Sequence, residues 1–277
     1  MQNIEGSVAI VTGASRGIGP FLALALAREK ATLVLAARSG DDLEAVADKL
    51  RAKGATVLTV VCDVAVAEDR AALVAQAIAK FGRIDILVNN AGIGITTPYE
   101  SQPIEEIEQI LNVNLTAPML LTKAVLPGML ERGSGFIVNI ASLAAKVGTP
   151  FSSPYSASKG GLVMFTESFR SEFRKRGVSA TAICPGFVSD AGMYEEMERK
   201  AGVRASKLAG TSSPQKVAAA TIRAIKRDTP EVIVNPGPIR LISGFAELFP
   251  GLFERIYPVF GANKLFAKVA KRGGGGA

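Results

Sequence analysis

Short apolar runs, most of them β-branched, alternate along the chain with longer amphipathic segments that are rich in alanine. The runs predict strands at 8–12, 32–37, 56–62, 84–89, 135–141, 179–184 and 231–234. The segments between them predict helices at about 17–30, 41–53, 67–81, 103–131, 154–177 and 214–227. Several strands are apolar nearly throughout, which indicates a parallel sheet covered on both faces. The pattern predicts an α/β fold with a doubly wound, parallel, seven-stranded sheet.

Residues 1–235 contain this sheet and no linker rich in proline, glycine or serine, so we expect a single domain. Residues 236–272 differ in composition and predict a C-terminal helical extension. Aromatic residues recur there every four positions: Phe245, Phe249, Phe253 and Tyr257. Pro250 and Gly251 interrupt this stripe, so two short apolar helices are predicted. Residues 273–277 are expected to form a disordered tail.

The extension also carries a group of basic residues: Lys264, Lys268, Lys271 and Arg272. Aromatic stripes at helical spacing usually pack against protein, so we expect the extension to cap a pocket or to bury a subunit contact. Peripheral contact with an acidic membrane surface is the alternative.

The composition, 48% hydrophobic and 21% charged over 277 residues, is that of an ordinary globular protein. No apolar run reaches the length of about 18 residues that a membrane-spanning helix needs. The first residues show no signal-peptide pattern, so we expect a cytoplasmic protein, with a location at the membrane periphery as the alternative. The net charge of +7 favours anionic partners such as a phosphorylated cofactor. No nucleic-acid-binding motif is present, and nucleic acid is not an expected partner.

Histidine is absent, which excludes Ser–His–Asp and Cys–His catalysis and every histidine metal site. The two cysteines, Cys62 and Cys184, are too few for a structural zinc site and are expected to be reduced core residues, so no metal is predicted. Proton chemistry must therefore use Tyr, Lys, Asp, Glu or Ser.

A glycine-rich turn follows the first strand and precedes the first helix, with the spacing G-x-x-x-G-x-G. Such a turn lets backbone approach a pyrophosphate at a helix N-terminus. It predicts dinucleotide binding, and the alternative is a purely structural loop. The residues predicted to contact the cofactor here are Gly13, Ser15, Arg16, Gly17, Ile18 and Gly19.

The second strand ends at Arg38, where an NAD-selective site would place a carboxylate for the ribose 2′-hydroxyl. Arg38, helped by Arg16, suits a 2′-phosphate, so NADP(H) is predicted in preference to NAD(H). A solvated loop arginine is the alternative.

Two further strand ends carry cofactor candidates. Asp63 and Val64 follow the third strand, where Asp63 could bind the adenine amine or simply cap a helix. Asn90, Ala91 and Gly92 follow the fourth strand and fit close approach to a planar ligand, although an ordinary turn would look the same.

Tyr155 and Lys159 stand four residues apart on a predicted helix and therefore face the same way. A phenol has a pKa of about 10, and a neighbouring ammonium lowers that pKa by stabilising the phenolate. General acid–base catalysis requires such a shift. In isolation, a core tyrosine and a solvated lysine would be the commoner interpretation.

These features together resemble the classical short-chain dehydrogenase/reductase (SDR) family. The resemblance covers about residues 5–235 and rests on the turns at 12–19 and 89–92 and on Asp63, Asn114, Ser142, Tyr155, Lys159, Pro185 and Gly186. It implies a Rossmann-type fold and hydride transfer between a nicotinamide cofactor and a carbonyl or alcohol.

The resemblance also implies catalytic roles. Ser142 would bind the substrate oxygen, and Tyr155 would exchange a proton with it. Lys159 would lower the pKa of Tyr155 and hold the nicotinamide ribose. Asn114 would interrupt its helix so that its carbonyl holds a water connected to Lys159.

Pro185, Gly186 and Val188 would border the nicotinamide. Asp190 stands where the family usually has threonine, so no cofactor contact beyond Val188 is predicted. Residues 189–213 are expected to cover the substrate. Together with Ser142 and Tyr155, the predicted substrate pocket includes Phe151, Met193 and Tyr194.

The leading hypothesis is an NADP(H)-preferring oxidoreductase for a small-molecule carbonyl/alcohol pair, lipophilic in view of the aromatic extension. The alternatives are a 3-oxoacyl thioester reductase and a non-catalytic dinucleotide-binding sensor or scaffold. The resemblance further implies a homodimer or homotetramer, built through the helices near 103–131 and 154–177.

Overall fold

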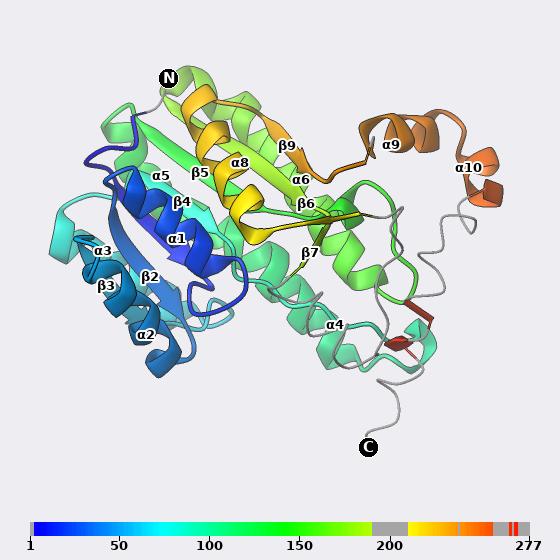
Figure 1. Cartoon of the computed structure of the whole chain (residues 1–277), viewed down its shortest axis with the longest axis horizontal. Coiled ribbons are helices and arrows are strands. Elements are labelled where there is room, and N and C mark those ends of the chain that lie inside the picture. Colours follow the sequence, from blue (N-terminus) through cyan, green and yellow to red (C-terminus); the bar gives the residue numbers. More distant parts are fainter. Residues whose placement is uncertain (1–2, 190–209, 238, 257–265, 268, 271–277) are drawn as a thin grey trace.

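Seven strands form one parallel sheet in the order β3-β2-β1-β4-β5-β6-β9 (Figure 1). The structure is a computed structural model that describes residues 3–189, 210–237, 239–256, 266–267 and 269–270. The chain builds the sheet outward from β1, first through β2 and β3 and then, in the other direction, through β4. This reversal is the doubly wound, Rossmann-type arrangement that the sequence predicted.

The bounds of the elements agree with the predicted ranges to within a few residues. The strands are β1 (Val8–Thr12), β2 (Thr32–Ala37), β3 (Val57–Val61), β4 (Ile86–Asn89), β5 (Gly135–Ile140), β6 (Val178–Pro185) and β9 (Glu231–Val234). The helices between them are α1 (Gly19–Arg28), α2 (Gly40–Arg51), α3 (Ala67–Phe81), α4 (Ile104–Leu111), α5 (Ala117–Glu131), α6 (Ser153–Phe173) and α8 (Pro214–Arg227). Single 3-10 turns lie at η1 (Tyr99–Ser101), η3 (Leu143–Ala145) and η4 (Arg174–Arg176).

Helices cover both faces of the sheet. Residues of α1, α2 and α8 pack in one hydrophobic cluster, and residues of α3, α5 and α6 pack in the other. The strands feed both clusters: on β1, Ala9 and Val11 belong to the first, whereas Val8 and Ile10 belong to the second. This two-sided burial explains why the strands are apolar nearly throughout.

Two local features interrupt the regular pattern. The long helix predicted at 103–131 contains a π-helical turn, η2 (Asn112–Thr116), between α4 and α5. A short parallel ladder between β7 (Phe187–Val188) and β8 (Thr211–Ser212) was not predicted, because two-residue strands leave no periodic signal.

The helical run Ile104–Glu131 is long and apolar enough, by length and composition, to cross a membrane. It packs against the sheet instead, through Val113, Ala117, Leu121 and Val125. No other helix in the described part of the chain passes the same test.

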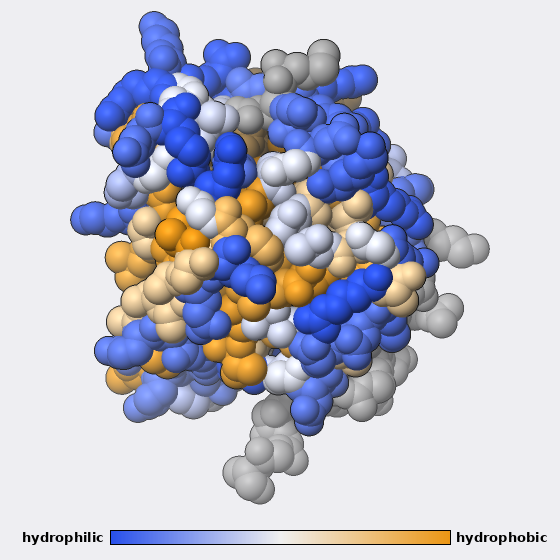
Figure 2. Space-filling model, turned by 90° about the vertical axis from the view of Figure 1, so that its left-hand side faces the viewer, coloured by the Kyte–Doolittle hydropathy of each residue, from blue (hydrophilic) through white to orange (hydrophobic). Residues whose placement is uncertain are grey.

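The two edges of the sheet differ. On the side of β3, apolar residues gather between hydrophilic ones (Figure 2), and Val61 on β3 and Ile78 on α3 are among the exposed apolar residues there. The other edge, β9, leads into the C-terminal extension.

The extension contains two short helices, α9 (Ile239–Leu248) and α10 (Pro250–Ile256), as predicted. Ser243 is the one buried residue described on either helix. On the aromatic stripe, Phe245 and Phe253 are half-buried and Phe249 is exposed. Whether the extension caps a pocket or buries a subunit contact stays a prediction. Tyr257, the four basic residues of the extension and the tail at 273–277 lie outside the described residues.

Further along, the extension returns to the main body. Phe266 is buried, and its ring lies 6.1 Å from that of Phe187 on β7, measured between centroids. This contact places the last described residues beside the turn that was predicted to border the nicotinamide.

Candidate active site

The predicted site residues converge at the carboxyl edge of the sheet. Thr12, Asn89 and Pro185 end β1, β4 and β6, while Arg38 and Ser142 follow β2 and β5. The strand order reverses between β1 and β4, and in open parallel sheets this reversal creates a binding crevice at the carboxyl edge.

The glycine turn between β1 and α1 has a backbone that side chains would disrupt. Gly13 and Gly17 have positive φ angles, 63° and 64°. A Cβ on Gly19 would lie 2.1 Å from the Gly13 carbonyl oxygen. No side chain caps α1, and its first turn contains no acidic residue. The turn therefore leaves free N–H groups and a positive helix terminus, which fits a dinucleotide pyrophosphate.

Asn90 holds this turn in place. Its Nδ2 donates to the carbonyls of Thr12, at 2.9 Å, and Gly13, at 3.0 Å. The Thr12 hydroxyl in turn accepts the backbone N–H groups of Asn90 and Ala91. Sequence reasoning missed Thr12, although its position at the start of the glycine turn was a usable signal.

The remaining residues of the turn, Ser15, Arg16 and Ile18, sit between β1 and α1, and Arg16 is exposed. Arg38 is also exposed and faces Asp63, with 3.9 Å between its Nη1 and the carboxylate. The Asp63 Oδ1 accepts the N–H of Ala65 at 2.9 Å. Asp63 therefore stabilises its own turn and does not cap α3 (Ala67–Phe81), whose N-cap is Val66, while its second oxygen faces the arginine beside the crevice. Val64 is buried.

Asn114 lies inside the π-turn η2 and is fully buried. Its side chain replaces backbone partners: Oδ1 accepts the N–H of Ile93 at 2.9 Å, and Nδ2 donates to the Ile93 carbonyl at 2.8 Å. Nδ2 also lies 3.2 Å from the Ser158 hydroxyl, which joins η2 to α6. The interrupted helix that the family resemblance implied at this position is present.

Lys159 is buried beside Asn114. A Cβ on Gly92 would lie 3.2 Å from Asn114 Oδ1 and 3.4 Å from Lys159 Nζ, so Gly92 packs directly against both groups. The amine donates to the Ile140 carbonyl at 2.9 Å and lies 5.8 Å from the Tyr155 ring centroid. Burial lowers the pKa of Lys159 to about 8.

Tyr155 and Ser142 form a hydroxyl pair. Burial raises the pKa of Tyr155, and the hydrogen bond from Ser142 opposes this rise. Ser142 caps η3, where its hydroxyl also accepts the N–H of Ala144 at 3.2 Å. The predicted lowering of the Tyr155 pKa by Lys159 is not present in this arrangement, because Lys159 is not among the groups that shift this pKa and burial sets its direction.

Cys184 lies beneath these groups and is fully buried, as is Cys62. Burial raises the pKa of Cys184 to about 12 and that of Cys62 to about 11, which makes both thiols inert. The prediction of reduced core cysteines is confirmed. No cluster of metal-ligating side chains occurs among the described residues.

The turn after β6 brings Gly186 against the end of β9. The Gly186 N–H donates to Val234, and a Cβ there would lie 2.3 Å from Asn235 Oδ1. Both polar atoms of the Asn235 amide are buried and have no hydrogen-bond partner among the described residues. Sequence reasoning missed this donor–acceptor pair, for which a polar residue directly after the last strand was the only signal.

Phe151 lies in the loop between Ser142 and Tyr155. It has a φ of 62°, which is rare for a bulky residue, and its carbonyl accepts the N–H of Thr97 at 2.9 Å. This bond joins two loops at the crevice edge. Met193, Tyr194 and Asp190 lie outside the described residues.

Comparison with known proteins agrees with the geometry. The family described as short chain dehydrogenase matches residues 7–202. Ketoacyl reductase HetN from Nostoc sp. is 44% identical over 94% of this chain and 91% of its own length. A 3-oxoacyl-[acyl-carrier-protein] reductase from Synechocystis sp. is 38% identical over 82% of this chain and 92% of its own length.

A solved structure gives the same result. An actinorhodin polyketide ketoreductase with NADPH superposes with a TM-score of 0.79 and 32% identity, covering 86% of this chain and 98% of the ketoreductase. The shared fold includes the sheet edge at which the candidate residues converge.

Proposed function

The chain belongs to the short-chain dehydrogenase/reductase family, and from that membership we propose that it is an NADP(H)-dependent enzyme that interconverts a carbonyl and an alcohol. The observation that supports this proposal most directly is the hydrogen-bonded pair of Ser142 and Tyr155 with the buried amine of Lys159 behind it. The polar groups of a proton-transfer site and a glycine turn suited to a pyrophosphate thus lie at one sheet edge.

NADPH, when bound, supplies the hydride for reduction. The protein's own residues bind and protonate the substrate carbonyl oxygen. In our proposal, the Ser142 and Tyr155 hydroxyls donate to the substrate carbonyl and stabilise the negative charge that develops on it. Tyr155 then gives its proton to that oxygen. Tyr155 is protonated near neutrality and so has a proton to give, although burial, by raising the pKa of the phenol, makes it a weaker acid.

In this proposal, Lys159 supplies a proton to the Tyr155 phenol after the phenol has given its own to the substrate. Its pKa of about 8 leaves it largely protonated at neutral pH yet able to release a proton. Asn114 orders the backbone beside it through Ile93 and Ser158. We assign the Asn114 carbonyl to a water that links Lys159 to solvent.

The cofactor preference rests on charge. Arg16 and Arg38 are both exposed at the crevice edge, and no carboxylate ends β2. A guanidinium binds phosphate oxygens through paired hydrogen bonds, so both residues suit a ribose 2′-phosphate. Among the other proposed contacts, we assign Val188 to the carboxamide. The buried, unpaired amide of Asn235 lies beside Gly186 and could serve the same region.

A 3-oxoacyl thioester is the more specific substrate candidate. HetN and the Synechocystis protein carry the names of ketoacyl reductases, and HetN matches nearly the whole chain, extension included. A lipophilic acyl chain would also suit the aromatic residues beside the site, where Phe266 meets Phe187.

We place the enzyme in the cytoplasm as a homodimer or homotetramer. Helices α4, α5 and α6, which carry the family's usual contacts, expose large apolar residues: Ile104, Met119, Leu120 and Met164. Exposed apolar groups on adjacent helices are typical of a subunit interface.

The test is an oxidation assay that compares NADPH with NADH on acetoacetyl-coenzyme A, aliphatic and aryl ketones, and aldehydes. We expect turnover with NADPH, fastest on the thioester. If turnover is fastest on a simple ketone, the chain is still an oxidoreductase, but the 3-oxoacyl thioester is not its preferred substrate. No cofactor oxidation with any carbonyl, despite NADPH binding, would support the sensor alternative.

A further inference from the structure

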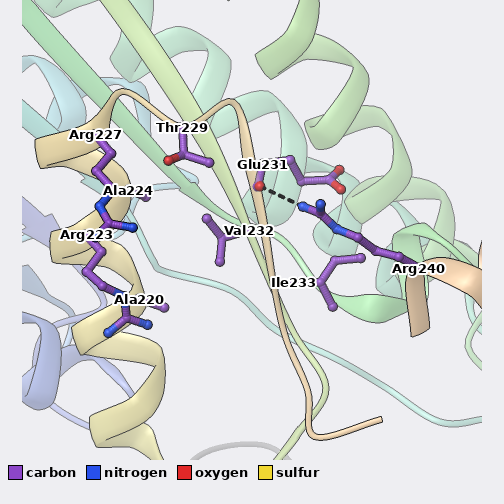
Figure 3. Close-up of a pocket in the computed structure, with 9 residues that line it drawn as sticks. All are labelled: Ala220, Arg223, Ala224, Arg227, Thr229, Glu231, Val232, Ile233 and Arg240. Carbon is purple, nitrogen blue, oxygen red and sulfur yellow. Dashed lines mark hydrogen bonds between the residues drawn. The ribbon is translucent and has the colours of Figure 1, made fainter. Parts of the chain in front are cut away.

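A groove with three arginines lies at the β9 edge of the sheet (Figure 3). It encloses about 280 Å³ between α8, β9 and α9. Arg223 and Arg227 project from α8 on one side, and Arg240 of α9 reaches in from the other (Figure 3). Its floor is apolar and is formed by Ala220, Ala224, Val232 and Ile233.

The positive charge of this groove is not neutralised by the described residues. Arg223 and Arg227 form no ion pair in the described part of the chain, and Arg240 donates to the backbone carbonyl of Glu231 at 3.2 Å. The neighbouring carboxylates serve other cations: Glu231 pairs with Lys146, and Asp228 pairs with residues of α6 and η4. Guanidinium groups arranged this way favour an anion with several oxygens, such as a phosphate.

An exposed apolar stripe begins at the next residue after Arg240. Leu241, Leu248, Phe249 and Leu252 expose 76%, 75%, 53% and 51% of their surface. Together with half-buried Phe245, they give α9 and α10 each exposed apolar residues. Exposure of so many large apolar side chains in sequence marks an interaction surface.

Charge identifies the partner. Residues 236–277 contain six basic and two acidic side chains, a net charge of +4. A second copy of this chain would bring like-charged grooves together, whereas an acidic membrane would neutralise them. Apolar residues together with an excess of basic ones are the composition of helices that lie in a membrane interface.

We propose that α9, α10 and the arginine groove dock the enzyme on membranes that contain acidic phospholipid. The stripe enters the headgroup region, and the three arginines bind lipid phosphates. Because the extension returns to Phe187 through Phe266, docking holds the crevice near the membrane surface, where amphiphilic substrates concentrate.

The experiment is co-sedimentation of the full-length protein with vesicles of phosphatidylcholine alone or of phosphatidylcholine with phosphatidylglycerol. We expect binding to the acidic vesicles that falls at high salt, and little binding to the neutral ones. The double variant Leu248→Glu/Leu252→Glu should abolish binding. Arg223→Glu/Arg227→Glu should weaken it by about tenfold or more, since each basic residue near an acidic surface contributes on the order of 1 kcal/mol.

Matched controls change the same number of charges elsewhere. Lys49→Glu/Lys80→Glu on α2 and α3 should weaken binding far less than the groove variant, and Val61→Glu/Ile78→Glu at the β3 edge should leave most binding intact. Cofactor binding should be normal in every variant, which shows that each is folded. Equal binding to both vesicle types, no binding at all, or equal losses in groove and control variants would overturn the proposal. So would a dimer in light scattering that Leu248→Glu/Leu252→Glu converts to monomer.

Discussion

The Lys159 amine lies 5.8 Å from the Tyr155 ring centroid and donates its hydrogen bond to the Ile140 carbonyl rather than to the phenol. Burial therefore sets the direction of each pKa: it raises that of Tyr155 and lowers that of Lys159 to about 8. The ammonium is then a stronger acid than the phenol, whereas in water the two pKa values nearly coincide. A phenolate left at Tyr155 after proton donation would take its proton back from Lys159 downhill, which supports the assigned roles.

Replacing Tyr155 by phenylalanine removes the proposed proton donor with little change in volume. General acid–base groups typically contribute about 10²- to 10⁴-fold, so kcat should fall by that range. The dissociation constant for NADPH, measured by fluorescence titration, should change little. Tyr99→Phe, which removes an exposed phenol, is the control and should behave like the wild type. A Tyr155→Phe enzyme of normal kcat would remove Tyr155 from the mechanism.

Arg38→Ala should change cofactor choice rather than activity as such. A hydrogen bond to a charged group contributes about 1.5–3 kcal/mol, so kcat/KM for NADPH should fall roughly 10- to 100-fold. The value for NADH, which has no 2′-phosphate, should be nearly unchanged. Lys49→Ala on α2 provides a control for loss of one exposed positive charge. Equal losses of kcat/KM with NADPH and NADH would show that Arg38 supports the fold of the crevice and does not bind the 2′-phosphate.

Lys159→Met should stabilise the protein while it abolishes activity. A pKa lowered from 10.5 to about 8 means that the folded state binds fewer protons than the unfolded chain between those two pH values. Wild-type stability due to this group therefore rises with pH through that window, and below about pH 8 the full cost of burying the charge is present. That cost is on the order of 3 kcal/mol, against about 1 kcal/mol for the lost bond to Ile140.

Urea denaturation of both proteins at several pH values measures this difference. The methionine variant should be more stable by about 2 kcal/mol at pH 7, and its advantage should shrink as the pH rises above 8. An advantage that stays constant with pH would mean that Lys159 titrates normally in the folded protein.

The sheet and its helices were predictable because burial on both faces imposes an apolar pattern on each strand. The motif residues Gly13, Asn114, Ser142 and Lys159 were also predictable, since the family places them at fixed points of that frame. The groups to which these residues are hydrogen-bonded were less predictable. The Ile140 carbonyl and the Ser158 hydroxyl become ligands only through contacts between distant segments, and neither residue type marks a site.

The C-terminal extension shows a different limit. Four-residue aromatic spacing predicted α9 and α10 correctly, because periodicity determines which side of a helix is apolar. Periodicity does not determine what covers that side. The sequence favoured packing against protein, as a pocket cap or a subunit contact, and it could not show that Leu241 and Leu248 are exposed while Phe266 is buried.

Two adjacent glycines in α6 give the last prediction, because their surroundings differ. A Cβ on Gly160 would meet no atom within 4 Å, whereas a Cβ on Gly161 would lie 3.0 Å from a methyl of Leu115. Alanine in a helix interior is about 0.5–1 kcal/mol more favourable than glycine. Gly160→Ala should therefore raise the free energy of unfolding by about that amount.

Gly161→Ala serves as the matched comparison in the same measurement. It gains the same helix propensity, but Leu115 in η2 must move, and η2 also holds Asn114. Its stability should gain less or fall, and its kcat should drop while that of Gly160→Ala is retained. Equal stabilisation and equal activity of the two variants would show that the contact between α6 and η2 is loose enough to accept a methyl group, and that the geometry around Asn114 does not depend on it.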